Sequence, residues 1–222
     1  MISKIEVDGF RSLSKFNLEL LKGVNILVGP NGAGKTNIVL FFEFLSYIST
    51  QPLSNAVSAL GGAGSVFRKK GQTDYQNRID FQIIGTVEAD VDQRQFSYEY
   101  SAEIGISFEK DDVFYSKQIL KICFDPDAEA HTKSLFKNTN DYDFHVEMSG
   151  LGETARVKVH SADPSLLKGM FYYHDSDTGD AISIEELEKV LSQRRSYSLS
   201  LVVNVCSHFE ELSKMRLSLI HI

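Results

Sequence analysis

One eight-residue segment limits the possible folds of this chain more than any other feature. Residues Gly29–Thr36 read GPNGAGKT and satisfy the spacing Gly-x-x-x-x-Gly-Lys-Ser/Thr. Glycines permit positive φ angles, so successive backbone N–H groups can turn toward an anion, and a helix beginning at Lys35 would add its N-terminal dipole. Lys35 would bring a positive charge to the outer phosphates, and Thr36 a hydroxyl to Mg²⁺. The segment therefore predicts a phosphate-binding loop, or P-loop.

The residues on either side of the loop match the context that this motif requires. Val24–Val28 is a short, continuous apolar run, which is typical of a strand buried on both faces. Asn37–Ile48 is apolar on nearly every side, so we expect a helix enclosed between two layers. Pro52, inside the break Thr50–Ser54, predicts the end of that helix. Strand, glycine-rich turn and helix together predict an α/β nucleotide-binding domain.

Alternating apolar and polar residues predict strands around this segment. The clearest alternation, over Phe96–Phe108, lies between two further runs with short turns, which predicts an antiparallel meander. A glycine-rich loop at Gly61–Gly64 precedes the meander, and a helical pattern begins at Ile184. The predicted strands are Met1–Val7, Phe16–Leu20, Ile79–Ile83, Phe96–Phe108, Val113–Phe124, Phe144–Met148 and Ala155–His160.

Composition limits the classes of protein to which this chain could belong. The 222 residues are 42% hydrophobic, which is enough for a sizeable core. A formal net charge of −7 argues against a surface coated with phosphate-neutralising cations, although Arg68–Lys70 could contact nucleic acid or form a solvated loop. Cys123 and Cys206 lack metal-ligand spacing and predict reduced thiols in a cytoplasmic protein. No apolar run reaches the roughly 18 residues of a membrane helix, so no membrane association is predicted.

The opening of the chain resembles the heads of ABC-type ATPases of the RecF, SMC and OLD (overcoming lysogenization defect) group. The resemblance rests on Ile5–Leu13, which reads IEVDGFRSL, and on Val24–Asn37. It is close over residues 1–48 and looser to about residue 124. It implies a head in which an antiparallel subdomain follows the first helix, and which forms a homodimer around two ATP molecules. It also implies work on DNA or in phage defence, with a nuclease partner or fused nuclease domain as a further possibility.

The resemblance extends the candidate nucleotide site beyond the P-loop. In the family, the arginine of the FRS segment lies near the nucleotide, which carries over to Arg11; a surface arginine is the alternative interpretation. Catalytic residues are not identified by the sequence, and Thr36 is the expected Mg²⁺ ligand. The predicted ATP-binding residues are Arg11, Gly29, Asn31, Gly32, Ala33, Gly34, Lys35, Thr36 and Asn37.

Two motifs that hydrolysis requires in this family are not recognised. A signature Ser-Gly motif and a Walker B strand ending in Asp-Glu have only faint counterparts, at Ser149–Glu153 and Ile119–Asp125, in reversed order. We interpret these as a hairpin turn and a strand end. Tyr197–Val205 is apolar enough for Walker B but ends in Cys206. Two functions remain open: an ATPase in a DNA-related process, and a nucleotide-binding scaffold or sensor that does not hydrolyse ATP itself.

An acidic segment near the C-terminus has the rhythm of a calcium-binding EF-hand loop. Asp175–Glu186 carries acids at loop positions one, three and twelve. Gly179 at position five offers no side-chain ligand, and Asp180 stands where glycine is needed for the turn. We interpret the segment as an acidic loop before a helix, with Ser183 as N-cap. No tight Ca²⁺ site is expected.

The predicted fold class is α/β: a P-loop NTPase N-terminal lobe with an inserted antiparallel β meander and a missing C-terminal lobe. The last six residues, Leu217–Ile222, resemble the in-frame translation of a transposase-end sequencing adapter. We therefore expect a truncated chain with a non-native tail. The predicted divisions are 1–78 for the P-loop lobe, 79–160 for the antiparallel subdomain, 161–216 for a mixed helical segment and 217–222 for the tail.

Overall fold

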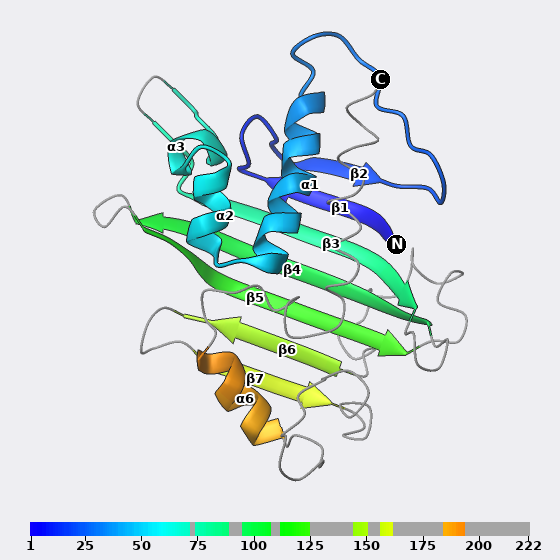
Figure 1. Cartoon of the computed structure of the whole chain (residues 1–222), viewed down its shortest axis with the longest axis vertical. Coiled ribbons are helices and arrows are strands. Elements are labelled where there is room, and N and C mark those ends of the chain that lie inside the picture. The colour runs from blue at the N-terminus through cyan, green and yellow to red at the C-terminus, as the bar shows by residue number, and fades with distance from the viewer. Residues whose placement is uncertain are drawn as a thin grey trace.

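The computed structural model describes residues 1–71, 74–88, 95–107, 112–124, 144–150, 156–161 and 184–193. In this part of the chain, seven strands form one antiparallel sheet in the order β2-β1-β3-β4-β5-β6-β7, with the helices on one of its faces (Figure 1). The strands are β1 (Ile2–Asp8), β2 (Phe16–Glu19), β3 (Arg78–Glu88), β4 (Gln95–Ser107), β5 (Asp112–Phe124), β6 (Phe144–Ser149) and β7 (Arg156–Ser161). The helices are α1 (Lys35–Thr50), α2 (Leu53–Ala59), α3 (Ala63–Val66) and α6 (Ile184–Gln193).

The predicted antiparallel meander is confirmed. β3, β4 and β5 pair in sequence order, and β6 and β7 extend the sheet in the same sense. β1 lies inside the sheet, because it pairs with β2 on one side and with β3 on the other. The sheet is thus continuous across residue 78, where we expected a division; the proposed division into a lobe and a subdomain remains a prediction.

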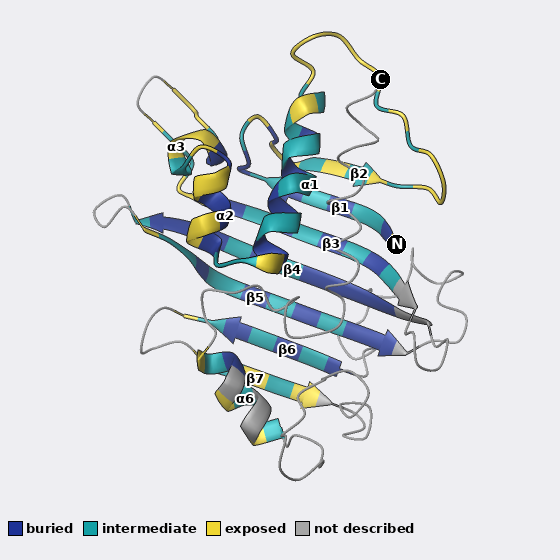
Figure 2. Ribbon diagram, viewed as in Figure 1, coloured by how far each residue is buried: buried dark blue, intermediate teal, exposed yellow. Residues whose placement is uncertain are grey.

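The core lies between the sheet and the helices above it. α1 buries Phe41 and Phe44 against the sheet, where their rings meet Phe10 from the N-terminal turn and Phe81 from β3. Figure 2 shows buried positions both on α1 and on the strands of the sheet. Ring centroids are 5.2 Å apart for Phe10 and Phe41 and 5.6 Å apart for Phe41 and Phe81, both edge to face. Full burial of one such side chain contributes about 1.5–3 kcal/mol to folding. This cluster ties the residues on both sides of the P-loop to the sheet.

The helix after the P-loop is confirmed, but its surroundings differ from the expectation. α1 ends at Thr50, and Pro52 precedes α2. Its sheet-facing residues are buried, whereas Val39 and Phe42 on other faces are only half-buried within the described structure. Within the described residues, α1 is therefore covered by the sheet on one side, and the second expected layer is not seen.

The expectation of a buried strand at Val24–Val28 is wrong for the described structure. These residues are irregular backbone, and the exposed fractions are 88% for Val24, 68% for Ile26 and 89% for Val28. Leu21, just before them, is 72% exposed. The apolar character of this segment therefore did not predict burial. No described strand pairs with this segment.

The C-terminal predictions are met in part. The helix from Ile184 is α6, which packs against β7, and its Leu191 is buried. Gly150 follows β6 with φ of +88°, which fits the interpretation of a turn at Ser149–Glu153. Residues 119–124 belong to β5, an interior antiparallel strand. The segments Asp125, Asp175–Ser183, Tyr197–Val205, Cys206 and Leu217–Ile222 lie outside the described residues, as does the side chain of Glu186.

Candidate phosphate-binding site

The loop before α1 has the backbone shape that the motif predicts. Gly32 and Gly34 have φ of +84° and +87°, values that residues with a Cβ rarely adopt. Gly34 is the N-cap of α1, whose helical residues begin at Lys35. The Ala33 N–H donates to the Pro30 carbonyl at 3.2 Å, which closes the turn. The loop thus places free N–H groups at the positive end of a 16-residue helix.

Lys35 folds back over this loop. Its Nζ donates to the carbonyl oxygens of Gly29 at 2.6 Å and Pro30 at 2.9 Å. The ammonium group therefore sits over the arch of the loop, next to the backbone N–H groups that could receive phosphate. Thr36 is exposed in the first turn of α1, so its hydroxyl is accessible to a metal ion or to solvent.

Arg11 lies in a tight turn beside α1. It has φ of +49°, which is uncommon for a residue with a side chain, and its backbone N–H donates to the Val66 carbonyl at 2.8 Å. Its Nη2 donates to the Leu60 carbonyl at 2.9 Å. The turn is closed by the bond from the Leu13 N–H to the Phe10 carbonyl at 2.7 Å. Arg11 is thus held by α3 and by the loop that follows α2.

A side-chain hydrogen bond joins this turn to the P-loop helix. Asn37 Nδ2 donates to Ser12 Oγ at 2.6 Å, and Asn37 belongs to the first turn of α1. A Cβ on Gly34 would lie 3.6 Å from the same Ser12 oxygen. The predicted site residues Arg11 and Asn37 therefore lie beside the P-loop. Ser12 was missed as a site residue by the sequence reasoning, although it belongs to the FRS segment.

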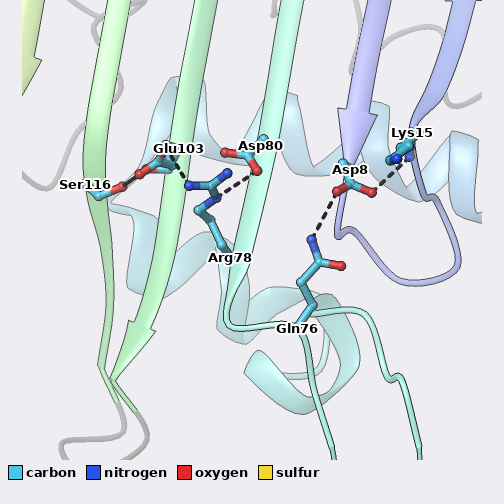
Figure 3. A network of polar contacts seen from close by, with 7 residues as sticks. All are labelled: Asp8, Lys15, Gln76, Arg78, Asp80, Glu103 and Ser116. Carbon is cyan, nitrogen blue, oxygen red and sulfur yellow. Dashed lines mark hydrogen bonds and ion pairs between the residues drawn. The ribbon is translucent and has the colours of Figure 1, made fainter.

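A polar network on the sheet fixes the other end of the turn (Figure 3). Asp8 accepts hydrogen bonds from the Lys15 backbone N–H at 2.9 Å and from Gln76 Nε2 at 3.2 Å. Burial acts to raise the pKa of Asp8, but these bonds, together with Ser14 and the nearby Arg68, outweigh it and lower the pKa below its ordinary value of 3.8. The charged carboxylate is thus the form that holds the turn to β1.

The same network continues across the sheet. Arg78 contacts Asp80 at 2.9 Å and Glu103 at 3.2 Å, and Glu103 accepts a hydrogen bond from Ser116 (Figure 3). Burial raises the pKa of Asp80 despite the attraction of Arg78. These contacts brace the strand ends next to the turn.

A basic pocket opens between the Arg11 turn, α3 and the start of α1. Its volume is about 450 Å³. It joins two regions that the sequence reasoning treated separately, the FRS segment and the basic run Arg68–Lys70. We call it the basic pocket; it is lined by Arg11, Ser12, Asn37, Gly64, Ser65, Phe67, Arg68 and Lys69.

Among the described residues, no group of three or more His, Cys, Asp or Glu side chains could hold a metal ion. None of the helices in the described part of the chain is long and apolar enough to cross a membrane.

Comparisons with known proteins agree with the resemblance. The Rad50 ATPase for DNA double-strand break repair of Methanopyrus kandleri is 46% identical over 39 residues, 18% of this chain and 4% of that protein. The DNA replication and repair protein RecF of Bifidobacterium longum subsp. infantis is 43% identical over 56 residues, 25% and 14% of the two chains. The chromosome partition protein Smc of Methanocaldococcus jannaschii is 50% identical over 38 residues, 17% and 3% of the two chains.

These relatives match over only a small part of their own length. The family comparison covers much more of this chain, because a model described as AAA domain matches residues 4–215. The match includes the P-loop, the Arg11 turn and the described sheet. The chain therefore belongs to the AAA domain family, and part of it is similar to the RecF and Smc proteins.

Proposed function

We propose that this chain binds Mg-ATP at Gly29–Thr36 and serves as the nucleotide-binding part of an ATPase in a DNA-related process. The observation that carries the proposal is the P-loop itself: glycines at positive φ, a helix that begins at Lys35, and the Lys35 ammonium held 2.6 Å from the Gly29 carbonyl. This arrangement offers N–H donors, a helix dipole and a cation to one polyphosphate. Thr36 would supply the hydroxyl ligand of Mg²⁺.

The relatives support the wider context of the proposal. Their names associate them with DNA double-strand break repair, DNA replication and repair, and chromosome partition. For the whole protein we propose a nucleotide-dependent homodimer in the cytoplasm that acts in repair, recombination or phage defence. A nuclease partner or fused nuclease domain belongs to the same proposal and rests on the resemblance alone.

Titration calorimetry with Mg-ATP on Lys35→Ala tests the binding site. Charge-assisted contacts are worth about 1.5–3 kcal/mol each, so Kd should rise roughly 10- to 150-fold. Lys189→Ala, which removes an exposed lysine on α6, is the matched control and should bind like the wild type. Equal Mg-ATP affinity in the wild type and Lys35→Ala would contradict the proposed binding site.

One observation favours the second candidate, a module that binds ATP without hydrolysing it. The first turn of α1 carries no acidic residue, and no described ion pair involves Lys35. Hydrolysis by enzymes of this kind needs a residue that orients the attacking water. We therefore expect the 222-residue chain to release phosphate from ATP at a negligible rate. Robust release by the wild type that is lost in Lys35→Ala would reject this second candidate.

A further inference from the structure

Several cations of the sheet have carboxylate partners. Lys117 contacts Glu147 at 3.1 Å, and Lys121 contacts Glu99 at 3.0 Å. A larger hollow of about 520 Å³, which includes Lys117 in its lining, lies over β1, β3 and β4 and is also lined by acids such as Glu103. Charge on this face is therefore balanced largely within the protein.

The cations of the basic pocket are different. No described ion pair involves Arg11, Arg68 or Lys69, and no acidic residue lines the pocket in the described structure. The Nε of Arg11 is buried and lacks a hydrogen-bond partner among the described atoms. Arg68 lies near enough to Asp8 to help lower its pKa, without forming an ion pair with it. In a chain with net charge −7, a cluster of unbalanced cations indicates an anionic ligand.

The backbone explains why these cations gather. Phe10 and Phe67 form an antiparallel bridge, flanked by the bond from the Arg68 N–H to the Gly9 carbonyl at 2.8 Å. Both phenylalanines point into the core. Because neighbouring residues in extended backbone point to opposite sides, Arg68 faces away from the core next to Phe67, and Arg11, which follows Phe10 in the turn, lines the same pocket. The bridge thus brings two arginines, far apart in the sequence, to one surface.

The positive surface continues from the pocket onto an exposed hairpin. The Gln76 N–H donates to the Arg68 carbonyl at 2.8 Å, and the Lys69 ammonium lies 5.8 Å from the centre of the Tyr75 ring. Lys69 and Lys70 are exposed. Figure 1 shows this hairpin projecting beyond α3, away from the sheet. The row of cations thus extends beyond the pocket itself.

We propose that Arg68, Lys69 and Lys70, with Arg11 at the floor of the basic pocket, bind the phosphate backbone of a nucleic acid. The proposal rests on the DNA-related part of the proposed function and names the surface that would make the contact. A row of unbalanced cations on an exposed hairpin suits a polyanion, because each contact releases counterions from the phosphate chain. The surface borders the P-loop helix through Ser12 and Asn37, so nucleic acid and nucleotide would occupy adjacent sites.

Fluorescence anisotropy with a labelled DNA duplex tests the surface. The double variant Arg68→Ala, Lys69→Ala should weaken DNA binding about tenfold or more, and should reduce the slope of log K against log salt by about two. The matched control is Arg156→Ala, Lys158→Ala, which removes the same two residue types from exposed positions on β7. The control should keep the affinity and the slope of the wild type.

Calorimetry with Mg-ATP on the same variants separates the two proposals. We expect the Arg68, Lys69 variant to bind ATP like the wild type. Loss of ATP affinity as large as in Lys35→Ala, with DNA binding unchanged, would assign the pocket to the nucleotide and overturn the inference. Failure of the wild type to bind ATP, with the DNA result intact, would instead overturn the nucleotide proposal alone.

Two further outcomes are decisive. Equal losses of DNA affinity in the pocket variant and the β7 control would indicate nonspecific attraction and overturn the inference. Absence of DNA binding by the wild type would do the same. If the alanine variant melts at a lower temperature, Arg68→Gln with Lys69→Gln keeps the side-chain bulk, and the same loss of DNA affinity is expected.

Discussion

Two short apolar segments of this molecule, residues 24–28 and residues 79–83, have similar composition and opposite surroundings. Ile79, Phe81 and Ile83 are buried in β3, between β1 and β4. Val24 and Val28 are exposed, and no described strand pairs with their backbone. The difference lies in the neighbours, because a meander supplies its own partners through short turns whereas the segment before the P-loop does not. Apolar composition shows which residues favour burial, not what will cover them.

Substituting one isoleucine in each segment tests this difference in surroundings. Ile83→Ala in the core should lower the free energy of unfolding by about 2–5 kcal/mol. Ile26→Ala in the exposed segment should change it by less than about 0.5 kcal/mol. Urea denaturation followed by circular dichroism measures both. A large cost for Ile26→Ala would mean that this side chain is covered in solution.

Substituting one crowded and one open glycine tests the same difference through the backbone. Gly9 has φ of +86°, and a Cβ there would lie 2.3 Å from the Arg78 carbonyl oxygen. Gly23, before the exposed segment, has φ of +99° and open space around it. Gly9→Ala should therefore cost about 2–4 kcal/mol, and Gly23→Ala about 1 kcal/mol from backbone strain alone. Thermal melts of the two variants give the comparison, and similar losses would contradict it.

Alanine substitutions at two lysines should affect folding stability and ATP affinity separately. Lys121→Ala leaves the buried Glu99 without its partner at 3.0 Å and should cost about 1–3 kcal/mol of folding free energy while ATP affinity is kept. Lys35→Ala removes bonds only to exposed loop carbonyls, so stability should fall by at most about 1 kcal/mol. Denaturation and calorimetry on both proteins check this. A loss of ATP affinity in Lys121→Ala would show that the two regions are coupled.

The smallest expected effect concerns pH and the turn after β1, which Asp8 holds through its bond from the Lys15 backbone N–H. The pKa of Asp8 in the folded protein lies below 3.8, so its charged form stabilises the fold above that pH and the contribution is lost as pH falls through the folded-state pKa. Asp8→Asn should therefore lose less stability than the wild type between about pH 5 and pH 3. Urea midpoints across that range measure it. If the urea midpoints of the wild type and Asp8→Asn fall equally with pH, Asp8 does not contribute to the loss of stability in acid.

Much of the sheet could be predicted, because its signals are local. The alternation over Phe96–Phe108 and the short turns around it were sufficient for β3 to β5. The P-loop shape could also be predicted, since Gly32 and Gly34 stand where positive φ is required. Its role in binding nucleotide, and that of Arg11, remain predictions.

The rest depends on contacts between segments that are distant in the sequence. The basic pocket exists because Phe10 bridges to Phe67, and no periodicity in either segment indicates that pairing. The bond between Ser12 and Asn37 depends on the same arrangement. The error at Val24–Val28 has the same origin, since a strand is defined by its partner as much as by its own residues.

The inner position of β1 has a consequence for synthesis on the ribosome. β1 pairs with β3, and the Thr86 N–H donates to the Met1 carbonyl at 2.8 Å. The first strand cannot complete its pairing until β3 has left the exit tunnel, whereas the local hydrogen bonds of α1 can form earlier. During that interval the nascent chain would expose the Phe41 and Phe44 side chains, which the finished protein buries. The aromatic face of α1 thus stays uncovered until β3 has been synthesised.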